Sequence, residues 1–203
     1  MSVKPIRLHP TRRSIIATAT GLAAAGFWGN CGRAQLSEAD LPDAMDALTQ
    51  MMPQAAPKLT FRNAKGRQLS LADYAGHALV VNLWATWCGP CVAEIPSFAA
   101  LSRKLAASGA LVLPISVDMN GAEAVRPFYA SHNIISLPIL LDPDGANFQV
   151  LNTDSIPVTL VLNASGQMVA RTDGAANWDT PRTLEFLQSL AVKPQNQDGF
   201  IPV

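Results

Sequence analysis

The chain has 203 residues, which is enough for one ordinary domain with additional segments at its ends. Its 15 Lys and Arg residues balance its 15 Asp and Glu residues, so the net charge gives no reason to expect a nucleic-acid partner or an acidic substrate. A content of 49% hydrophobic and 15% charged residues excludes overall disorder, and three cysteines exclude a framework of several disulfides.

The first 34 residues have the organisation of an export signal. Basic residues precede an uncharged stretch over residues 14–30, which is the order of a positive n-region and an apolar h-region. Residues 11–16 (TRRSII) resemble the twin-arginine signal, so we expect export of the folded protein to the periplasm. Cleavage before Gln35 would remove Cys31, whereas an uncleaved signal would tether the chain to the membrane. A lipid anchor on Cys31 is a third interpretation.

Residues 35–57 are predicted to form a short amphipathic helix and a linker. Apolar residues recur there at helical spacing, and Pro53 and Pro57 end the run. Its methionines could be soft-metal ligands, but methionine at helical spacing is more often core packing, which we expect here. The apolar positions are Leu41, Ala44, Met45, Leu48, Met51 and Met52.

Residues 58–192 are predicted to form one α/β domain. It begins with a hairpin, residues 59–62 and 68–71, around the turn-rich sequence NAKG. Residues 78–84 (ALVVNLW) are a nearly continuous apolar run, which is typical of a strand buried on both faces at the centre of a sheet. Residues 193–203 lack periodicity and are predicted to be a loose tail. Between these segments we expect a helix over 90–107, a strand over 111–117, a helix over 121–132, a strand over 137–141, a helix over 146–151, a hairpin of 158–162 with 168–171, and a helix over 179–192.

Two cysteines separated by two residues stand where the predicted central strand leads into a helix. Cys88 would lie at the helix mouth, where unpaired N–H groups stabilise a thiolate, so it is the candidate nucleophile. Cys91 lies one turn further along the helix and would resolve the mixed disulfide. A structural disulfide is less favoured, because so short a loop gains little from closure. Half of a zinc site is also less favoured, because no second CxxC exists and the histidines are scattered at His9, His77 and His132.

Residues 85–91 (ATWCGPC), placed after the buried strand, resemble the active-site segment of the thioredoxin superfamily. Pro96 lies within the following helix, at an offset where thioredoxin-like proteins carry a proline. The resemblance implies a thioredoxin-like α/β fold, with a central mixed sheet flanked by helices, an N-terminal hairpin and a helix-strand insertion. It also implies that Pro157 belongs to the cis-proline loop, although from the residues alone it could be a strand-entry proline. The implied substrate-binding residues are Trp87, Gly89, Pro90, Ile156 and Pro157.

Two polar positions near the cysteines point to one branch of the superfamily. Asn82 stands where thioredoxin carries a buried aspartate, and Glu94 follows Cys91 by three residues. The pattern Cys-x-x-Glu-x-Pro, together with residues 81–87 (VNLWATW), resembles the TlpA and ResA group of exported reductases. Glu94 shares a helix face with Cys91 and is a candidate for proton transfer near the pair. The alternative is an exposed carboxylate near the positive end of the helix dipole.

The resemblance also implies a direction of electron flow and a set of partners. A Gly-Pro dipeptide between the cysteines is what reducing thioredoxins carry, so we expect a protein-disulfide reductase with no cofactor besides the Cys88–Cys91 disulfide. Family relatives draw electrons from a membrane thiol transporter. The expected substrates are disulfides of exported proteins, either apocytochrome c or a protein that assembles copper centres of respiratory oxidases.

Two rival functions use the same fold. A thiol peroxidase would follow the pattern Pro-x-x-x-Thr-x-x-Cys, which residues 81–88 do not match. A copper chaperone would use Cys88 and Cys91 as soft ligands with a third group such as His132 or Met119. Nothing in the spacing supports that third ligand.

Overall fold

The computed structural model describes residues 36–191, and within them eight strands form one mixed sheet in the order β1-β8-β7-β4-β5-β6-β2-β3. The central strand β4 pairs in parallel with β5 and antiparallel with β7, as expected for the predicted thioredoxin-like fold. The strands are β1 (Thr49–Ala55), β2 (Thr60–Asn63), β3 (Gln68–Ser70), β4 (Ala78–Trp84), β5 (Ala110–Ser116), β6 (Leu140–Leu141), β7 (Val158–Leu162) and β8 (Gln167–Asp173).

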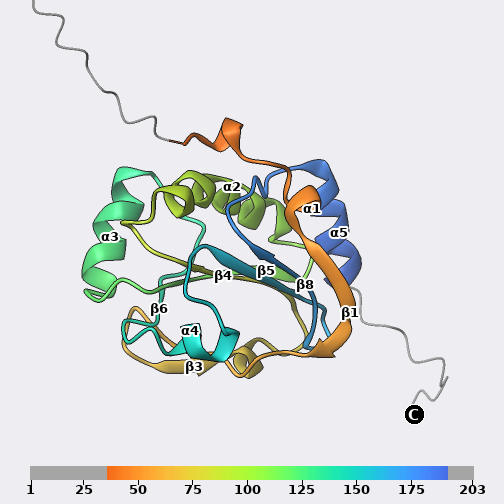
Figure 1. Cartoon of the computed structure of the whole chain (residues 1–203), viewed down its shortest axis with the longest axis horizontal. Coiled ribbons are helices and arrows are strands. Elements are labelled where there is room, and N and C mark those ends of the chain that lie inside the picture. The colour runs from red at the N-terminus through yellow and green to blue at the C-terminus, as the bar shows by residue number, and fades with distance from the viewer. Residues whose placement is uncertain (1–35, 192–203) are drawn as a thin grey trace, which may run out of the picture. The chain divides into compact units, whose positions relative to one another are not determined.

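Helices cover both faces of this sheet. Figure 1 shows α2 and α5 on one side of β4 and β5, with α4 on the opposite side. The α-helices are α1 (Ala44–Ala47), α2 (Gly89–Leu105), α3 (Ala122–Ser131), α4 (Ala146–Leu151) and α5 (Pro181–Ala191), and short 3₁₀ turns occupy Glu38–Asp40 and Leu71–Tyr74. None of the helices between residues 36 and 191 combines the length and the apolar character needed to cross a bilayer.

Strand β4 forms the centre of the core, as its sequence predicts. All seven of its residues are buried, because the strand has a neighbour on each edge and side chains packed on each face. Its carboxyl end leads directly into the N-terminus of α2, so the segment between them is fixed at both ends. This connection places the two cysteines at the carboxyl edge of the sheet.

The helix predicted from the apolar spacing over residues 41–52 is wrong. Only Ala44–Ala47 is helical, and from Thr49 the chain runs as the edge strand β1, paired antiparallel with β8. The backbone hydrogen bonds offered by β8 outweigh a local preference for helix, which is a weak bias when a sheet edge is available. Pro53 is tolerated because it lies on an edge strand, where the pairing register shifts between Gln50 and Gln54.

The methionines of this segment do not fill the core as predicted. Met51 is half-buried and Met52 is exposed, whereas Met45 on α1 packs against the core. Because β1 is part of the sheet, the compact fold begins before the boundary at residue 58 that the sequence suggests. The predicted signal over residues 1–34 and the predicted tail over residues 193–203 lie outside the described residues.

The other predicted elements are present with small changes at their ends. The hairpins β2–β3 and β7–β8 pair as expected, and α2 to α5 match the helical segments in order. The strand predicted over residues 137–141 is reduced to Leu140–Leu141, which bridges β5 and β2. The predicted helix-strand insertion is therefore present as α3 and the short strand β6, which follow β5.

Candidate functional site

Cys88 and Cys91 form a disulfide at the N-terminus of α2. The sulfurs are 2.07 Å apart, and Cys88 is the N-cap residue of the helix. The backbone N–H of Cys91 donates to Cys88 Sγ over 3.2 Å, so the helix end directs a hydrogen-bond donor at the outer sulfur. Cys88 is 7% exposed and Cys91 is fully buried, which makes Cys88 the sulfur that a partner can reach first.

Three residues beside the cysteines form an exposed rim. Trp87 is 69% exposed, and Gly89 and Pro90 are also exposed, although the Cys91 that follows them is buried. A large aromatic side chain in water is available for contact with another molecule. The sequence-predicted substrate residues on this side of the site therefore lie together on the surface.

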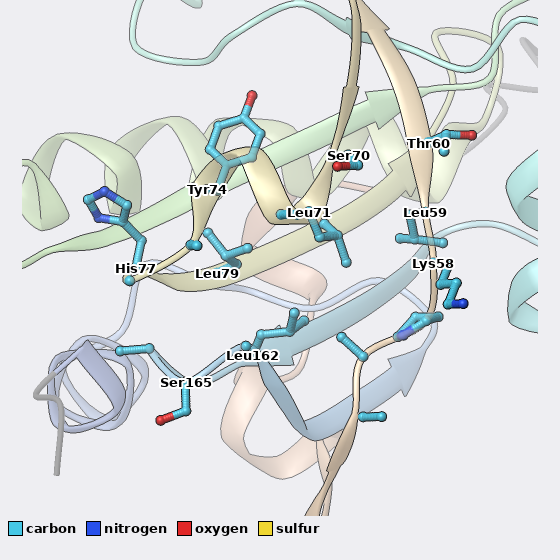
Figure 2. A pocket seen from close by; sticks show the side chains of 18 residues that line it. Lys58, Leu59, Thr60, Ser70, Leu71, Tyr74, His77, Leu79, Leu162 and Ser165 are labelled. Atoms are coloured by element: carbon cyan, nitrogen blue, oxygen red, sulfur yellow. The ribbon is translucent and has the colours of Figure 1, made fainter. Parts of the chain in front are cut away.

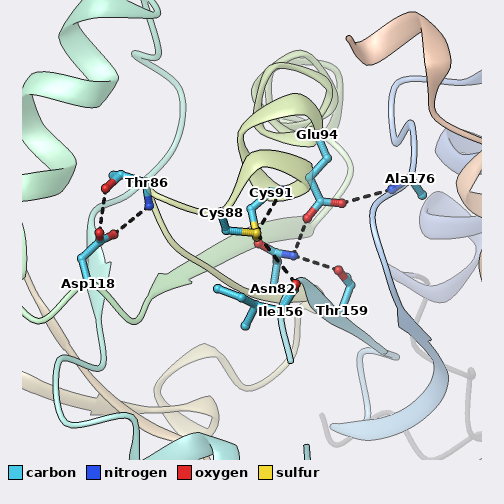
Figure 3. The surroundings of a disulfide bond; sticks show 9 residues. All are labelled: Asn82, Thr86, Cys88, Cys91, Glu94, Asp118, Ile156, Thr159 and Ala176. Carbon is cyan, nitrogen blue, oxygen red and sulfur yellow. Dashed lines mark hydrogen bonds between the residues drawn. A yellow bond between two sulfur atoms is a disulfide. The ribbon is translucent and has the colours of Figure 1, made fainter. Parts of the chain in front are cut away.

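The Ile156-Pro157 loop lies on the other side of the disulfide. Its peptide bond is cis, as the resemblance to thioredoxins predicts, and the Ile156 carbonyl oxygen lies 3.8 Å from Cys88 Sγ. The Pro157 carbonyl accepts a hydrogen bond from Gly174 N, which attaches the loop to the end of β8. Figure 3 shows the Ile156 carbonyl directed toward the disulfide, where extended backbone of a partner could pair with this loop.

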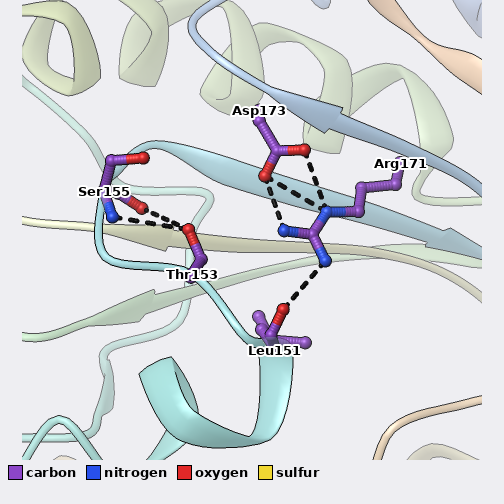
Figure 4. Close-up of polar contacts among 5 residues, drawn as sticks. All are labelled: Leu151, Thr153, Ser155, Arg171 and Asp173. Atoms are coloured by element: carbon purple, nitrogen blue, oxygen red, sulfur yellow. Dashed lines mark hydrogen bonds and ion pairs between the residues drawn. The ribbon is translucent and has the colours of Figure 1, made fainter.

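An arginine on β8 fixes the chain before this loop. Arg171 donates to the Leu151 carbonyl at the end of α4 over 3.0 Å and pairs with Asp173 over 2.6 Å (Figure 4). Thr153 Oγ1 donates to the Ser155 carbonyl in the intervening turn. Sequence reasoning missed this anchor, because Arg171 and Leu151 are 20 residues apart and the contact is to a backbone carbonyl.

A buried carboxylate fixes the segment that leads into Cys88. Asp118, two residues after β5, accepts hydrogen bonds from Thr86 N over 3.0 Å and Thr86 Oγ1 over 2.7 Å, and Ser116 Oγ donates to it over 2.8 Å. Asp118 is only 3% exposed. Asp118 belongs to no motif recognised in the sequence, although its position just after a buried parallel strand is where functional side chains gather.

Replacement of Asp118 with alanine should release the Thr86 segment. It removes the acceptor of the half-buried Thr86 N–H and hydroxyl and of the buried Ser116 hydroxyl, so we expect a loss of about 3 kcal/mol in the free energy of unfolding, measured in urea. Asp144→Ala, at an exposed turn position, is the matched control and should change stability by less than about 0.5 kcal/mol. Equal effects of the two substitutions would contradict the anchoring role.

Glu94 is fully buried, so its alternative interpretation as an exposed helix carboxylate is wrong. Oε1 accepts from Asn82 Nδ2 over 2.9 Å, and Oε2 accepts from Ala176 N over 3.2 Å and Trp178 Nε1 over 3.3 Å. Burial raises the pKa of Glu94 to about 8, against the opposing effect of these three donors. A carboxyl group with a pKa near 8 can both hold and release a proton close to neutral pH.

The cover over Glu94 comes from the segment before α5. Trp178 is fully buried and stacks on Phe98 of α2, with ring centroids 5.0 Å apart. Its backbone N–H donates to Ser97 Oγ, and that hydroxyl in turn donates to the Glu94 carbonyl over 2.7 Å. Sequence reasoning missed Trp178, because nothing local shows that residues 84 positions apart in the chain would meet.

Metal ligands do not gather around the cysteines in the described part of the chain. No group of three or more His, Cys, Asp and Glu side chains among residues 36–191 could hold a metal ion. His132 stacks on Phe128 and contacts its carbonyl oxygen, and His77 contacts the Gly109 carbonyl. Met119 is 88% exposed. His9 lies outside the described residues.

An apolar pocket of about 540 Å³ lies at the opposite end of β4 from the disulfide. Leu59, Leu79 and Leu162 line it, and Tyr74 and His77 lie near its rim (Figure 2). None of the sequence-predicted site residues lines this pocket. The redox site and the pocket are therefore separate features of the domain.

Comparison with known proteins agrees with the fold and the cysteine pair. The AhpC/TSA family matches residues 52–171. The thiol-disulfide oxidoreductase ResA of Bacillus subtilis is 27% identical over 114 residues, which cover 56% of this chain and 63% of ResA. The thioredoxin-like protein YneN of the same species is 34% identical over 117 residues, which cover 56% of this chain and 66% of YneN. The matched region is thus slightly less than two thirds of each of these relatives.

A solved structure shows the same architecture. The thiol:disulfide interchange protein of the thioredoxin family from Chlorobium tepidum superposes with a TM-score of 0.56 at 24% identity. The match covers 69% of this chain and 99% of that protein. At this identity the likeness establishes the thioredoxin-like fold, which agrees with the strand order and the cis-proline loop described above.

Proposed function

Because the chain belongs to the AhpC/TSA family and has the thioredoxin-like fold of ResA-type proteins, we propose that it is a thiol-disulfide oxidoreductase that reduces disulfides in other proteins. One observation carries the proposal. The Cys88–Cys91 disulfide caps α2 with its outer sulfur beside the exposed Trp87 and the Ile156 carbonyl, and with its inner sulfur buried. A disulfide that served only to staple the chain would need neither feature.

The arrangement supports a two-step exchange. In the reduced protein the Cys88 thiolate attacks one sulfur of a substrate disulfide, forms the mixed disulfide and releases the other substrate sulfur as a thiolate. Cys91 then loses its proton and attacks Cys88 Sγ. That step forms the Cys88–Cys91 disulfide and releases the second substrate thiolate. Two electrons pass to the substrate, and the two released thiolates take up two protons.

We propose that Glu94 exchanges the proton of this second step. It follows Cys91 by one turn of α2 and is linked through Asn82 to the strand beneath the disulfide (Figure 3). With a pKa of about 8, its ionised form can accept the proton that Cys91 must lose. The three donors around its oxygens hold the carboxyl group in place before and after that transfer.

The compartment and the partners of the protein form the finer part of the proposal. A twin-arginine signal over residues 1–34 would deliver the folded protein to the periplasm, where a reductant needs a supply of electrons. We propose a membrane thiol transporter as that donor. The proposed substrates are exported disulfide proteins in cytochrome c or copper-oxidase assembly, which the resemblance to the TlpA and ResA group supports.

The reduction potential of the cysteine pair tests the direction of electron flow. The full chain carrying Cys31→Ser would be equilibrated in defined thiol buffers, and Trp fluorescence would report the fraction reduced. We expect a potential of roughly −270 mV or lower, which is the range of reducing thioredoxins. A value near −120 mV would identify an oxidant that installs disulfides instead.

Two further assays separate this function from its rivals. If the protein is a peroxidase, its reduced form should consume hydrogen peroxide faster than it reduces protein disulfides. A copper chaperone would bind one copper ion per reduced chain, and Cys91→Ala would abolish that binding. Either result, together with absent disulfide exchange, would replace the proposed function.

A further inference from the structure

The side-chain carbonyl of Asn82 is an unpaired acceptor next to the redox pair. Asn82 is fully buried on β4, and its Nδ2 donates both protons, to Glu94 Oε1 over 2.9 Å and to Thr159 Oγ1 over 3.0 Å. Its Oδ1 is buried and has no hydrogen-bond partner among the described residues. A buried polar atom without a partner is costly and rare, so its presence at a functional site calls for an explanation.

The two acceptors of Nδ2 decide where Oδ1 points. Because Glu94 and Thr159 hold the two N–H bonds, the carbonyl points away from both of these acceptors. Cys91 is fully buried and lies one turn before Glu94, on the same buried face of α2. Figure 3 shows the Asn82 amide between Glu94 and the disulfide, with its oxygen on the side of the sulfurs.

Neither sulfur can use this acceptor while the disulfide is closed, because neither carries a proton. Reduction adds two electrons and two protons, breaks the S–S bond and leaves thiols on Cys88 and Cys91. The Cys91 thiol then becomes a buried donor beside a buried acceptor. Cys88 Sγ keeps its own partners, which are the Cys91 N–H at the helix end and the Ile156 carbonyl oxygen.

We propose that in the reduced protein the Cys91 thiol donates a hydrogen bond to Asn82 Oδ1, and that this bond stabilises the dithiol relative to the disulfide. The inference rests on the proposed cycling of Cys88 and Cys91 and assigns Asn82 a direct contact with a reacting atom. The unpaired oxygen is a cost borne by the oxidised form and relieved on reduction. Asn82 therefore raises the reduction potential above the value that the same site would have without it.

Substitution at Asn82 tests this in glutathione buffers. In the Cys31→Ser chain, we expect Asn82→Leu to lower the equilibrium constant for reduction of the pair about tenfold, which corresponds to about 30 mV toward more negative potential. Thr159→Val is the matched control, because it disturbs the same amide on its Nδ2 side while the Asn82 carbonyl and the hydrogen bond to Glu94 that orients the amide both remain. It should change the constant less than twofold. A shift below twofold in Asn82→Leu would overturn the proposal.

The stability of the two redox forms separates this contact from a merely structural role. A structural role would destabilise oxidised and reduced protein equally when Asn82 is replaced, and the potential would not move. We expect Asn82→Leu to destabilise the reduced form more than the oxidised form when each is unfolded in urea. The increase in the unfolding equilibrium constant should be about tenfold larger for the reduced form. Equal losses would overturn the proposal.

Infrared spectroscopy reads the bond directly. In a chain with Cys31 and Cys88 both replaced by serine, the S–H stretch of Cys91 should lie at lower frequency than in the same chain that also carries Asn82→Leu. Equal frequencies would contradict the hydrogen bond. None of these measurements uses a protein substrate. They can therefore contradict the hydrogen bond while disulfide exchange with substrates is observed, or support the hydrogen bond while that exchange is absent.

Discussion

Replacement of Cys91 with serine is expected to convert the protein into a covalent trap. Cys88 keeps its position at the end of α2 and still attacks a substrate disulfide, but the buried thiol that resolves the mixed disulfide is gone. Repeated turnover should fall on the order of 10³-fold, and a mixed disulfide through Cys88 should accumulate. Non-reducing electrophoresis and mass spectrometry of the purified adduct would identify the linked cysteine.

The matched variant is Cys88→Ser, which should neither turn over nor trap. Cys91 is fully buried behind Cys88, so a protein substrate cannot reach it without opening the site. Adducts formed through Cys91 in the Cys88→Ser chain would reverse the assignment of nucleophile and resolving cysteine. Absence of adducts in both variants would remove the support for disulfide exchange with protein partners.

Replacement of Glu94 with glutamine is expected to remove a large part of the pH dependence of stability. The pKa of Glu94 is about 8 in the folded protein against an ordinary value of 4.5, so between these pH values the folded state holds a proton that the unfolded state has lost. Stability therefore falls as the pH rises through this window, by on the order of 3 to 5 kcal/mol in total. Glu94→Gln does not titrate and should lack this fall.

The measurement is the free energy of unfolding in urea at a series of pH values, compared as the difference between wild type and variant. Glu123→Gln, which replaces an exposed carboxylate in the first turn of α3, is the control and should leave the fall in stability intact.

Glu94→Gln also tests proton transfer. In the wild type, the rate at which the mixed disulfide is resolved should rise about a hundredfold as the pH increases through 8. In Glu94→Gln this rise should be absent. Parallel profiles would leave Glu94 with a purely structural role.

The position of the redox pair follows from how its supports are divided among distant segments. Asp118 holds the chain before Cys88, Arg171 holds the chain before Pro157, and Trp178 covers the carboxyl group beneath Cys91. Each support comes from a different part of the sequence, and each uses a buried or half-buried polar contact. The disulfide is thereby fixed from three sides while Trp87 remains free on the surface.

Local sequence determined the parts of this protein whose physics is local. The apolar run over residues 78–84 specifies a strand buried on both faces, because no other short element hides so many consecutive apolar side chains. The Cys-x-x-Cys spacing specifies a pair on one turn of a helix. The N–H of Cys91 at the helix end then donates a hydrogen bond to Cys88 Sγ. Family resemblance, rather than local pattern, predicted the cis bond before Pro157.

Only the tertiary structure decided the features that depend on contacts between distant segments. Residues 49–55 join the sheet because β8 presents an open edge there, although the apolar spacing over residues 41–52 predicts a helix. Glu94 is buried with a raised pKa because Trp178 and Ala176 arrive from the far end of the chain, whereas its place near the start of a helix suggests an exposed carboxylate. Spacing along the chain fixes which side chains share a face, and packing alone fixes which of those faces water can reach.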